Sequence, residues 1–195
     1  AFHRDVEVDD LGFIRYLVTY MQQEYGAHTS HVFATGMSNG GDMSFYLACQ
    51  AGDVFAGYAP IAGTMMKEIA DNCASQAVEP IMAVNGTADD VTFYEGDPDN
   101  RGGWGVYLDI PSIVEFWTTR HELSLTSTEE LDDIANDDGS TVSLERYGKN
   151  GGIDAFRLYR VNDGGHDWPG AWGNMDLQTS EEVWKFFKEI IDAAP

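Results

Sequence analysis

Apolar residues along this chain follow two patterns: a helical spacing in some segments and short continuous or alternating runs in others. The first segment with helical spacing has five apolar positions: Leu11, Ile14, Val18, Met21 and Tyr25. Asp9 or Asp10 can cap the start of this segment, and Gly26 follows its last position. A polar cap and a terminal glycine are usual helix boundaries, so the pattern predicts a helix of about 15 residues.

Short apolar or alternating runs predict five β-strands: 31–35, 55–62, 80–85, 141–147 and 153–161. Further helices are predicted at 41–50, from Asp109 and Pro111 onward, and at the end of the chain, where Thr179 and Glu182 match a capping box. Loops and turns are predicted for four other segments: 67–79, 95–105, an acidic insertion at 132–139, and 149–152.

Alternation of strands and helices predicts an α/β fold of three layers, αβα, with a mostly parallel sheet between helices. The 195 residues are enough for one domain, which we expect to span 1–195, because no repeat or linker divides the chain. In such sheets the chemistry gathers at the carboxyl ends of the strands. Residues just after the predicted strands are therefore the first candidates for function.

The segment Gly36-Met37-Ser38-Asn39-Gly40 lies between a predicted strand and a predicted helix. A serine between glycines at a strand–turn–helix junction is the nucleophile elbow of α/β-hydrolases. The turn strains the serine backbone, and small neighbours let the strand and helix approach each other. The motif predicts Ser38 as a nucleophile and the backbone N–H of Asn39 as an oxyanion donor.

A serine nucleophile needs a general base and a carboxylate that orients this base. His166 follows the last predicted strand in a glycine-flanked loop and is the predicted base. The other histidines lie at the terminus, before the nucleophile strand or at a helix end: His3, His28, His31 and His121. Asp89, just after the third predicted strand, is the preferred acid, with Asp90 second and Asp167 third. The order serine, acid, histidine is that of α/β-hydrolases.

Four aromatic residues are candidates for the wall of a substrate cleft: Trp168, Trp172, Tyr94 and Trp104. For Trp168 and Trp172, which flank the predicted base, simple packing of a loop is the alternative. The sequence has no phosphate-binding loop and no dinucleotide fingerprint, and the acidic insertion does not fit the EF-hand register. We therefore predict no cofactor and no metal.

The chain carries 33 acidic against 11 basic residues, a net charge of -22. This charge disfavours nucleic acids and anionic membranes as partners, and no stretch approaches the roughly 18 apolar residues of a membrane span. A solvated acidic surface and adaptation to high salt both fit the charge, and melting temperature against salt separates them. Cys49 and Cys73 are either buried thiols or one disulfide, which would indicate an oxidising compartment.

Motifs in order along nearly the whole chain resemble the esterase family of polyhydroxybutyrate depolymerases and the related feruloyl and acetyl-xylan esterases. The matching segments are 8–14, 34–41, 55–63, 85–89 and 164–170. The resemblance implies a secreted or periplasmic serine esterase that acts through an acyl-enzyme, with Ser38, Asp89 and His166 as its triad. Its substrates would be polyesters or feruloyl and acetyl esters of plant polysaccharides. The alternatives are a thioesterase or peptidase with the same triad and an impaired hydrolase module that binds polymer.

Members of that family usually carry an amino-terminal portion that supplies the first strands and a His-Gly loop with a second oxyanion donor. Nothing similar precedes Phe13 in this chain. The resemblance therefore implies the carboxyl-terminal part of a full-length hydrolase domain, without the amino-terminal strands. We expect the open edge of its first strand to be covered by a missing segment or by a second copy in a homodimer.

Overall fold

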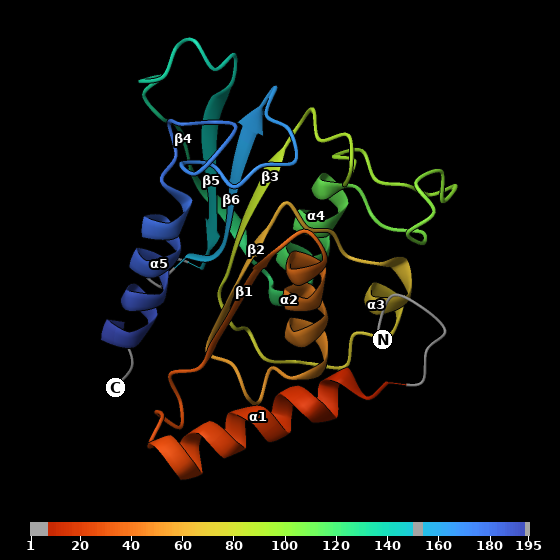
Figure 1. Cartoon of the computed structure of the whole chain (residues 1–195), viewed down its shortest axis with the longest axis vertical. Helices are drawn as coiled ribbons and strands as arrows, with labels where there is room; N and C mark the ends of the chain where they lie inside the picture. The colour runs from red at the N-terminus through yellow and green to blue at the C-terminus, as the bar shows by residue number, and fades with distance from the viewer. Residues whose placement is uncertain (1–7, 150–153, 194–195) are drawn as a thin grey trace.

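The computed structural model describes residues 8–149 and 154–193, which form one six-stranded sheet (Figure 1). Its strands are β1 (Phe33–Met37), β2 (Gly57–Ile61), β3 (Ile81–Gly86), β4 (Ser124–Glu130), β5 (Thr141–Gly148) and β6 (Asp154–Asn162). They lie in the order β1-β2-β3-β6-β5-β4. The first four in this order are parallel, and β5 and β4 add antiparallel pairs at one side. The predicted mostly parallel sheet is confirmed.

Helices cover both faces of this sheet, as the three-layer prediction requires. They are α1 (Asp10–Tyr25), α2 (Asn39–Gln50), α3 (Lys67–Asp71), α4 (Ile110–His121) and α5 (Thr179–Ala193). Figure 1 shows α2 and α4 on one face and α5 on the other, while α1 crosses the end at which β1 and β2 begin. The carboxyl ends of the parallel strands lie at the opposite edge.

Two apolar clusters lie on the two faces, and the side chains of β3 alternate between them. Ile81 and Ala83 belong to the larger cluster, under α2 and α4, whereas Met82 and Val84 belong to the smaller cluster, under α5. This alternation is the two-residue period of a strand. It explains why the β3 segment is continuously apolar, since a central parallel strand is buried on both faces.

Local capping signals set the helix boundaries where the sequence predicts them. The Asp9 carboxylate accepts the Gly12 N–H at 2.7 Å, and Gly26 ends α1 with φ 68°. The Asp109 carboxylate accepts the Ser112 N–H at 2.8 Å at the start of α4, with Pro111 in the first turn. These caps satisfy backbone groups that the helix itself cannot satisfy.

Two local predictions are wrong, and one strand was not predicted. The segment 67–79, predicted as a loop, contains the short helix α3, and the strand β4 was not predicted. All of β4 is exposed, so it lacks the alternation that marks a half-buried strand. The capping box fails because the buried Thr179 hydroxyl has no partner among the described residues, while the Glu182 carboxylate accepts the Tyr159 hydroxyl at 2.9 Å.

Most of the predicted turn at 149–152 lies outside the described residues. Cys49 and Cys73 form a disulfide that joins the end of α2 to the segment after α3. Of the two alternatives for these cysteines, the disulfide is therefore the observed one. Within 8–149 and 154–193, no helix is long and apolar enough to cross a membrane.

Candidate active site

Ser38 lies at the turn between β1 and α2, where its backbone has φ 57° and ψ -120°. A residue other than glycine that adopts a positive φ carries a backbone strain of roughly 1–3 kcal/mol. The Ser38 N–H donates to the Ile61 carbonyl of β2 at 2.9 Å, which fastens the turn to the sheet. The Ser38 side chain makes no capping hydrogen bond to α2. Its hydroxyl therefore remains available at the carboxyl end of β1, as the elbow motif predicts.

Glycines bring α2 directly against the strand ends. A Cβ on Gly36 would lie 2.8 Å from the Gly40 Cα, and a Cβ on Gly41 would lie 2.9 Å from the Gly63 Cα. Neither gap accepts a methyl group. Asn39 is the first residue of α2, and the first N–H groups of a helix have no partner within it. The helix start therefore offers backbone donors and a favourable dipole to a developing oxyanion.

Asp89 and His166 are 77 residues apart in sequence and meet at the carboxyl edge of the sheet. The Asp89 Oδ2 and the His166 Nδ1 are 2.8 Å apart. The other carboxylate oxygen accepts the N–H groups of Val91 and Thr92 at 2.8 and 2.7 Å. The side chain of Asp89 is 2% exposed, and that of His166 is 18% exposed. The buried carboxylate is thus fixed by the loop and in turn orients the imidazole.

The environment raises the pKa of His166 above its ordinary value of 6.5. The hydrogen bond to Asp89 is the largest cause, and burial acts in the opposite direction. The negative charges of Asp89, Asp167 and Asp42 raise this pKa further. An imidazole with a raised pKa accepts a proton more readily, which suits a general base that works on a hydroxyl group.

The loop after β3, which carries Asp89, is bonded directly to the loop after β6, which carries His166. The Ala88 N–H donates to the Gly164 carbonyl at 2.9 Å. The Asp163 N–H donates to the Thr87 hydroxyl at 2.8 Å. Hydrogen bonds between the two loops therefore hold the acid and the base at a fixed spacing.

The alternative acids and the other histidines lie in different surroundings. Asp167 accepts the Gly165 N–H at 3.0 Å and so shapes the His166 loop, while Asp90 is exposed. The rings of His28 and His31 stack 3.9 Å apart before β1 begins. His121 is buried in α4, and His3 lies outside the described residues.

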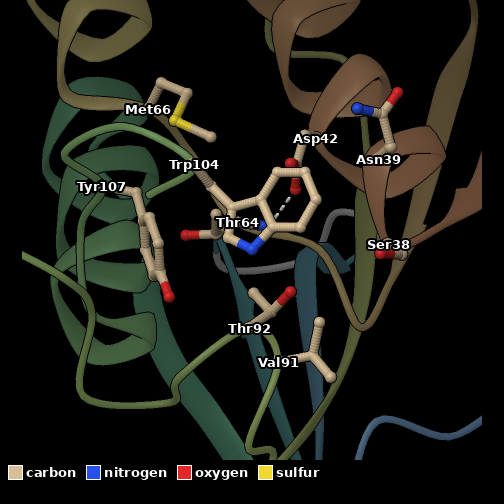
Figure 2. Close-up of a pocket in the computed structure, with 9 residues that line it drawn as sticks. All are labelled: Ser38, Asn39, Asp42, Thr64, Met66, Val91, Thr92, Trp104 and Tyr107. Atoms are coloured by element: carbon tan, nitrogen blue, oxygen red, sulfur yellow. Dashed lines mark hydrogen bonds between the residues drawn. The ribbon is translucent and has the colours of Figure 1, made fainter. Parts of the chain in front are cut away.

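A pocket with a volume of about 80 Å³ opens beside the elbow (Figure 2). Three of its residues, Ser38, Asn39 and Trp104, are among the predicted site residues. Sequence reasoning missed the other six: Asp42, Thr64, Met66, Val91, Thr92 and Tyr107. Only Asp42 had a local signal, because it lies in the first turn of α2, four residues after Ser38. The others come from loops that only the folded sheet brings together.

Of the four predicted wall residues, Trp104 alone lines this pocket. Tyr94 packs against the larger apolar cluster. Trp168 packs against the smaller cluster, and its indole N–H donates to the Ser180 hydroxyl at 3.0 Å. Trp172 is exposed in the loop after His166. Among the described residues, no group of three or more His, Cys, Asp or Glu side chains is arranged to hold a metal ion.

Comparison with known proteins finds esterases. The chain is 36% identical over 92 residues to feruloyl esterase B of Piromyces equi, covering 46% of this chain and 17% of that protein. It is 28% identical over 171 residues to a protein of Nocardia uniformis subsp. tsuyamanensis that carries the name esterase NocK, covering 83% and 49%. It is 31% identical over 104 residues to poly(3-hydroxyalkanoate) depolymerase C of Paucimonas lemoignei, covering 53% and 24%. The chain thus spans at most about half the length of these relatives.

No family model matches the chain. Among solved structures, the acetyl xylan esterase from Aspergillus awamori superposes with a TM-score of 0.58 at 15% identity, covering 91% of this chain and 66% of that one. A thermostable esterase superposes with a TM-score of 0.55 at 13% identity, covering 93% and 37%. The resemblance inferred from the motifs is confirmed: the chain has the α/β-hydrolase fold and is similar to feruloyl esterases and polyhydroxyalkanoate depolymerases.

Proposed function

We propose that this chain carries the catalytic site of a serine carboxylic ester hydrolase. The hydrogen bond between Asp89 and His166 is the observation that carries this proposal. It lies at the same edge of the sheet as the strained elbow serine, Ser38, whose φ is 57°. A carboxylate–imidazole pair beside an elbow serine is the constellation of acyl transfer.

The proposed reaction forms and then hydrolyses an acyl-enzyme. The Ser38 Oγ attacks the ester carbonyl carbon while the imidazole of His166 takes the hydroxyl proton through Nε2. The carbonyl oxygen becomes an oxyanion that accepts the Asn39 N–H. When the tetrahedral intermediate collapses, the bond to the alcohol breaks and His166 returns the proton to the leaving oxygen. A water molecule, deprotonated by the same imidazole, then releases the acid and restores the Ser38 hydroxyl.

Asp89 acts through the imidazole in this scheme. Its carboxylate accepts the Nδ1–H of His166, which leaves Nε2 free to accept a proton from Ser38. It also stabilises the imidazolium that forms in each half of the reaction. The raised pKa of His166 has the sign that this role requires.

The relatives bear on the substrate class and the location. Their names include feruloyl esterase and poly(3-hydroxyalkanoate) depolymerase, so we propose ester-linked polymers or their fragments as substrates.

The disulfide between Cys49 and Cys73 supports export to an oxidising compartment, because structural disulfides persist there. The net charge of -22 argues against nucleic acids and anionic membranes as partners.

The test is hydrolysis of nitrophenyl acetate by the wild-type chain, a Ser38→Ala variant and a Ser127→Ala control on the exposed strand β4. We expect Ser38→Ala to lose at least about 10³-fold in kcat/KM, and Ser127→Ala to match the wild type. A fluorophosphonate probe should label the wild type and the control alone. Equal turnover by Ser38→Ala and the wild type would contradict the assignment. Matched amide and thioester substrates distinguish an esterase from a peptidase or thioesterase.

A further inference from the structure

The outer wall of the pocket beside Ser38 is the indole of Trp104. Figure 2 shows this ring between Tyr107 and Met66 on one side and Ser38 and Asn39 on the other. Trp104 is 49% exposed although it lines the pocket, so its ring separates the pocket from solvent. Removal of the indole would therefore open the pocket on that side.

The buried side chain of Asp97 holds the segment that precedes Trp104 through hydrogen bonds. Asp97 is 0% exposed, and its carboxylate accepts the N–H groups of Arg101 and Gly102 at 2.8 and 2.7 Å. A buried carboxylate that receives two backbone donors holds its loop firmly, because the loss of either bond would leave a buried charge undersatisfied. The approach of the chain to Trp104 is therefore fixed.

The segment after Trp104 is fastened by Asn100. The Asn100 Oδ1 accepts the Gly105 N–H at 2.8 Å. Asn100, Gly103 and Gly105 have φ of 52°, 76° and 114°, a region that asparagine and glycine tolerate best. The loop therefore bends sharply on both sides of the indole, and hydrogen bonds from within the loop hold both bends.

The dimensions and charge of the pocket limit what can enter. Its volume of about 80 Å³ is roughly half of the 150 Å³ that holds benzene in an engineered protein cavity. The lining contains the Asp42 carboxylate and no basic side chain, so a negatively charged group would be repelled. The space suits a short, uncharged chain of about two to four carbons.

We propose that Trp104, held in place by Asp97 and Asn100, determines the length of the acyl chain that the enzyme accepts. This inference rests on the proposed esterase function. An ester whose carbonyl oxygen meets the Asn39 N–H has its carbonyl carbon at Ser38, and both residues line this pocket. That carbon carries two substituents, the acyl chain and the alkoxy group. His166, which protonates the alkoxy oxygen, does not line this pocket, so the acyl chain is the group that enters and meets the indole. Asn100 is a positioning residue, since it acts through the loop that carries Trp104.

The test compares kcat/KM for the nitrophenyl esters of acetate, butyrate and octanoate, which share one leaving group. We expect the wild type to prefer acetate and butyrate over octanoate by at least about 10-fold, and Trp104→Ala to reduce this preference by about 10-fold. Trp104→Phe should keep most of it. Trp184→Ala is the matched control, because Trp184 is 61% exposed on α5 outside the pocket, and its preference should equal that of the wild type.

The positioning role of Asn100 is tested with two further variants. Asn100→Gly tolerates the same backbone conformation but loses the bond to Gly105, so the preference for short chains should fall. Asn100→Asp keeps an oxygen that can accept the Gly105 N–H, so this variant should retain the preference for short chains. A general loss of stability at position 100 would not produce this difference between the two variants. If Trp104→Ala does not fold, the Asn100 pair decides the question.

Three outcomes overturn the inference. One is a wild type that hydrolyses octanoate as well as acetate. A second is a folded Trp104→Ala variant whose preference for short acyl chains equals that of the wild type. If Trp104→Ala does not fold, the same result in Asn100→Gly has this meaning. In both, serine-dependent turnover shows that the proposed function still holds. The third is a folded wild type without turnover of any ester, which overturns the proposed function and this inference with it.

Discussion

Gly86, at the end of β3, lies directly against Gly164 in the loop that carries His166. A Cβ on Gly86 would lie 2.7 Å from the Gly164 carbonyl carbon and would overlap the carbonyl oxygens of Gly164 and Gly165. The absence of a side chain at Gly86 is therefore what lets the Asp89 loop and the His166 loop touch. The spacing of the proposed acid and base depends on a backbone contact as well as on their hydrogen bond.

Gly86→Ala should displace the His166 loop and lower ester turnover. The methyl group has no space, so one of the two loops must move, and a displacement of about 1 Å at a reacting group costs on the order of 10²-fold in rate. Steady-state kinetics with nitrophenyl acetate measure the loss. Near wild-type kcat/KM in a variant with an unchanged melting temperature would show that the contact does not position His166.

The two outer glycines of the elbow motif should differ in their tolerance of alanine. A Cβ on Gly36 would lie 2.8 Å from the Gly40 backbone, whereas a Cβ on Gly40 would meet nothing within 4 Å. Gly36→Ala should therefore destabilise the fold by about 1–3 kcal/mol, as overpacking does. Gly40→Ala should be neutral or slightly stabilising, since alanine favours a helix. Denaturant unfolding of both variants checks this, and equal destabilisation would contradict it.

Ester turnover should fall as the pH drops through a midpoint above 6.5, because His166 must be neutral to act as a base and its pKa is raised, chiefly by Asp89. Asp89→Asn should move this midpoint to lower pH and reduce the plateau rate by up to about 10⁴-fold. Asp167→Asn removes a nearby charge and keeps a side-chain oxygen that can accept the Gly165 N–H, so the midpoint should shift in the same direction with a smaller loss of rate.

Profiles of kcat/KM against pH for the three proteins test this prediction. A midpoint that stays in place or rises in Asp167→Asn would contradict the electrostatic account. The raised pKa of His166 also stabilises the fold fully below the unfolded-state pKa near 6.5. That contribution is lost as the pH rises through the folded-state value.

Loss of the disulfide should lower stability without removing the site. Cys49 lies near the end of α2 and Ser38 at its start, so roughly 15 Å of helix separates the disulfide from the proposed nucleophile. A Cys49→Ala/Cys73→Ala variant should lose about 2–4 kcal/mol in the free energy of unfolding. Fluorophosphonate labelling of the folded variant should persist. A reductant should lower the melting temperature of the wild type but not that of the variant.

The sequence predicts those parts of the molecule whose determinants are local. The caps at Asp9 and Asp109 and the strained turn at Ser38 are set by neighbouring residues, so their patterns are visible in the chain. The pairing of Asp89 with His166 was also accessible, because residues that follow parallel strands meet at one edge of the sheet. The hydrogen bond between Asp89 and His166 agrees with the predicted pairing, while the catalytic roles of these two residues stay predictions.

The remaining features depend on contacts that no local pattern encodes. The polar strand β4 has no buried face, and α3 has only five residues. Thr179 does not cap α5, because packing buries its hydroxyl at the first helical position. The pocket escapes prediction for a similar reason, since Thr64, Val91 and Tyr107 come from separate segments.

The disulfide and most residues of the two apolar clusters lie away from the edge at which the pocket opens, although Met66 and Tyr107 of the larger cluster also line the pocket. The pocket wall formed by Thr92 and Trp104 belongs to loops beyond that edge. Thermal tolerance and substrate choice can therefore be varied separately at Thr92 and Trp104, which belong to neither apolar cluster. A randomised library confined to these two positions should explore new acyl preferences while most of its members still fold, which makes this chain a suitable starting point for directed evolution.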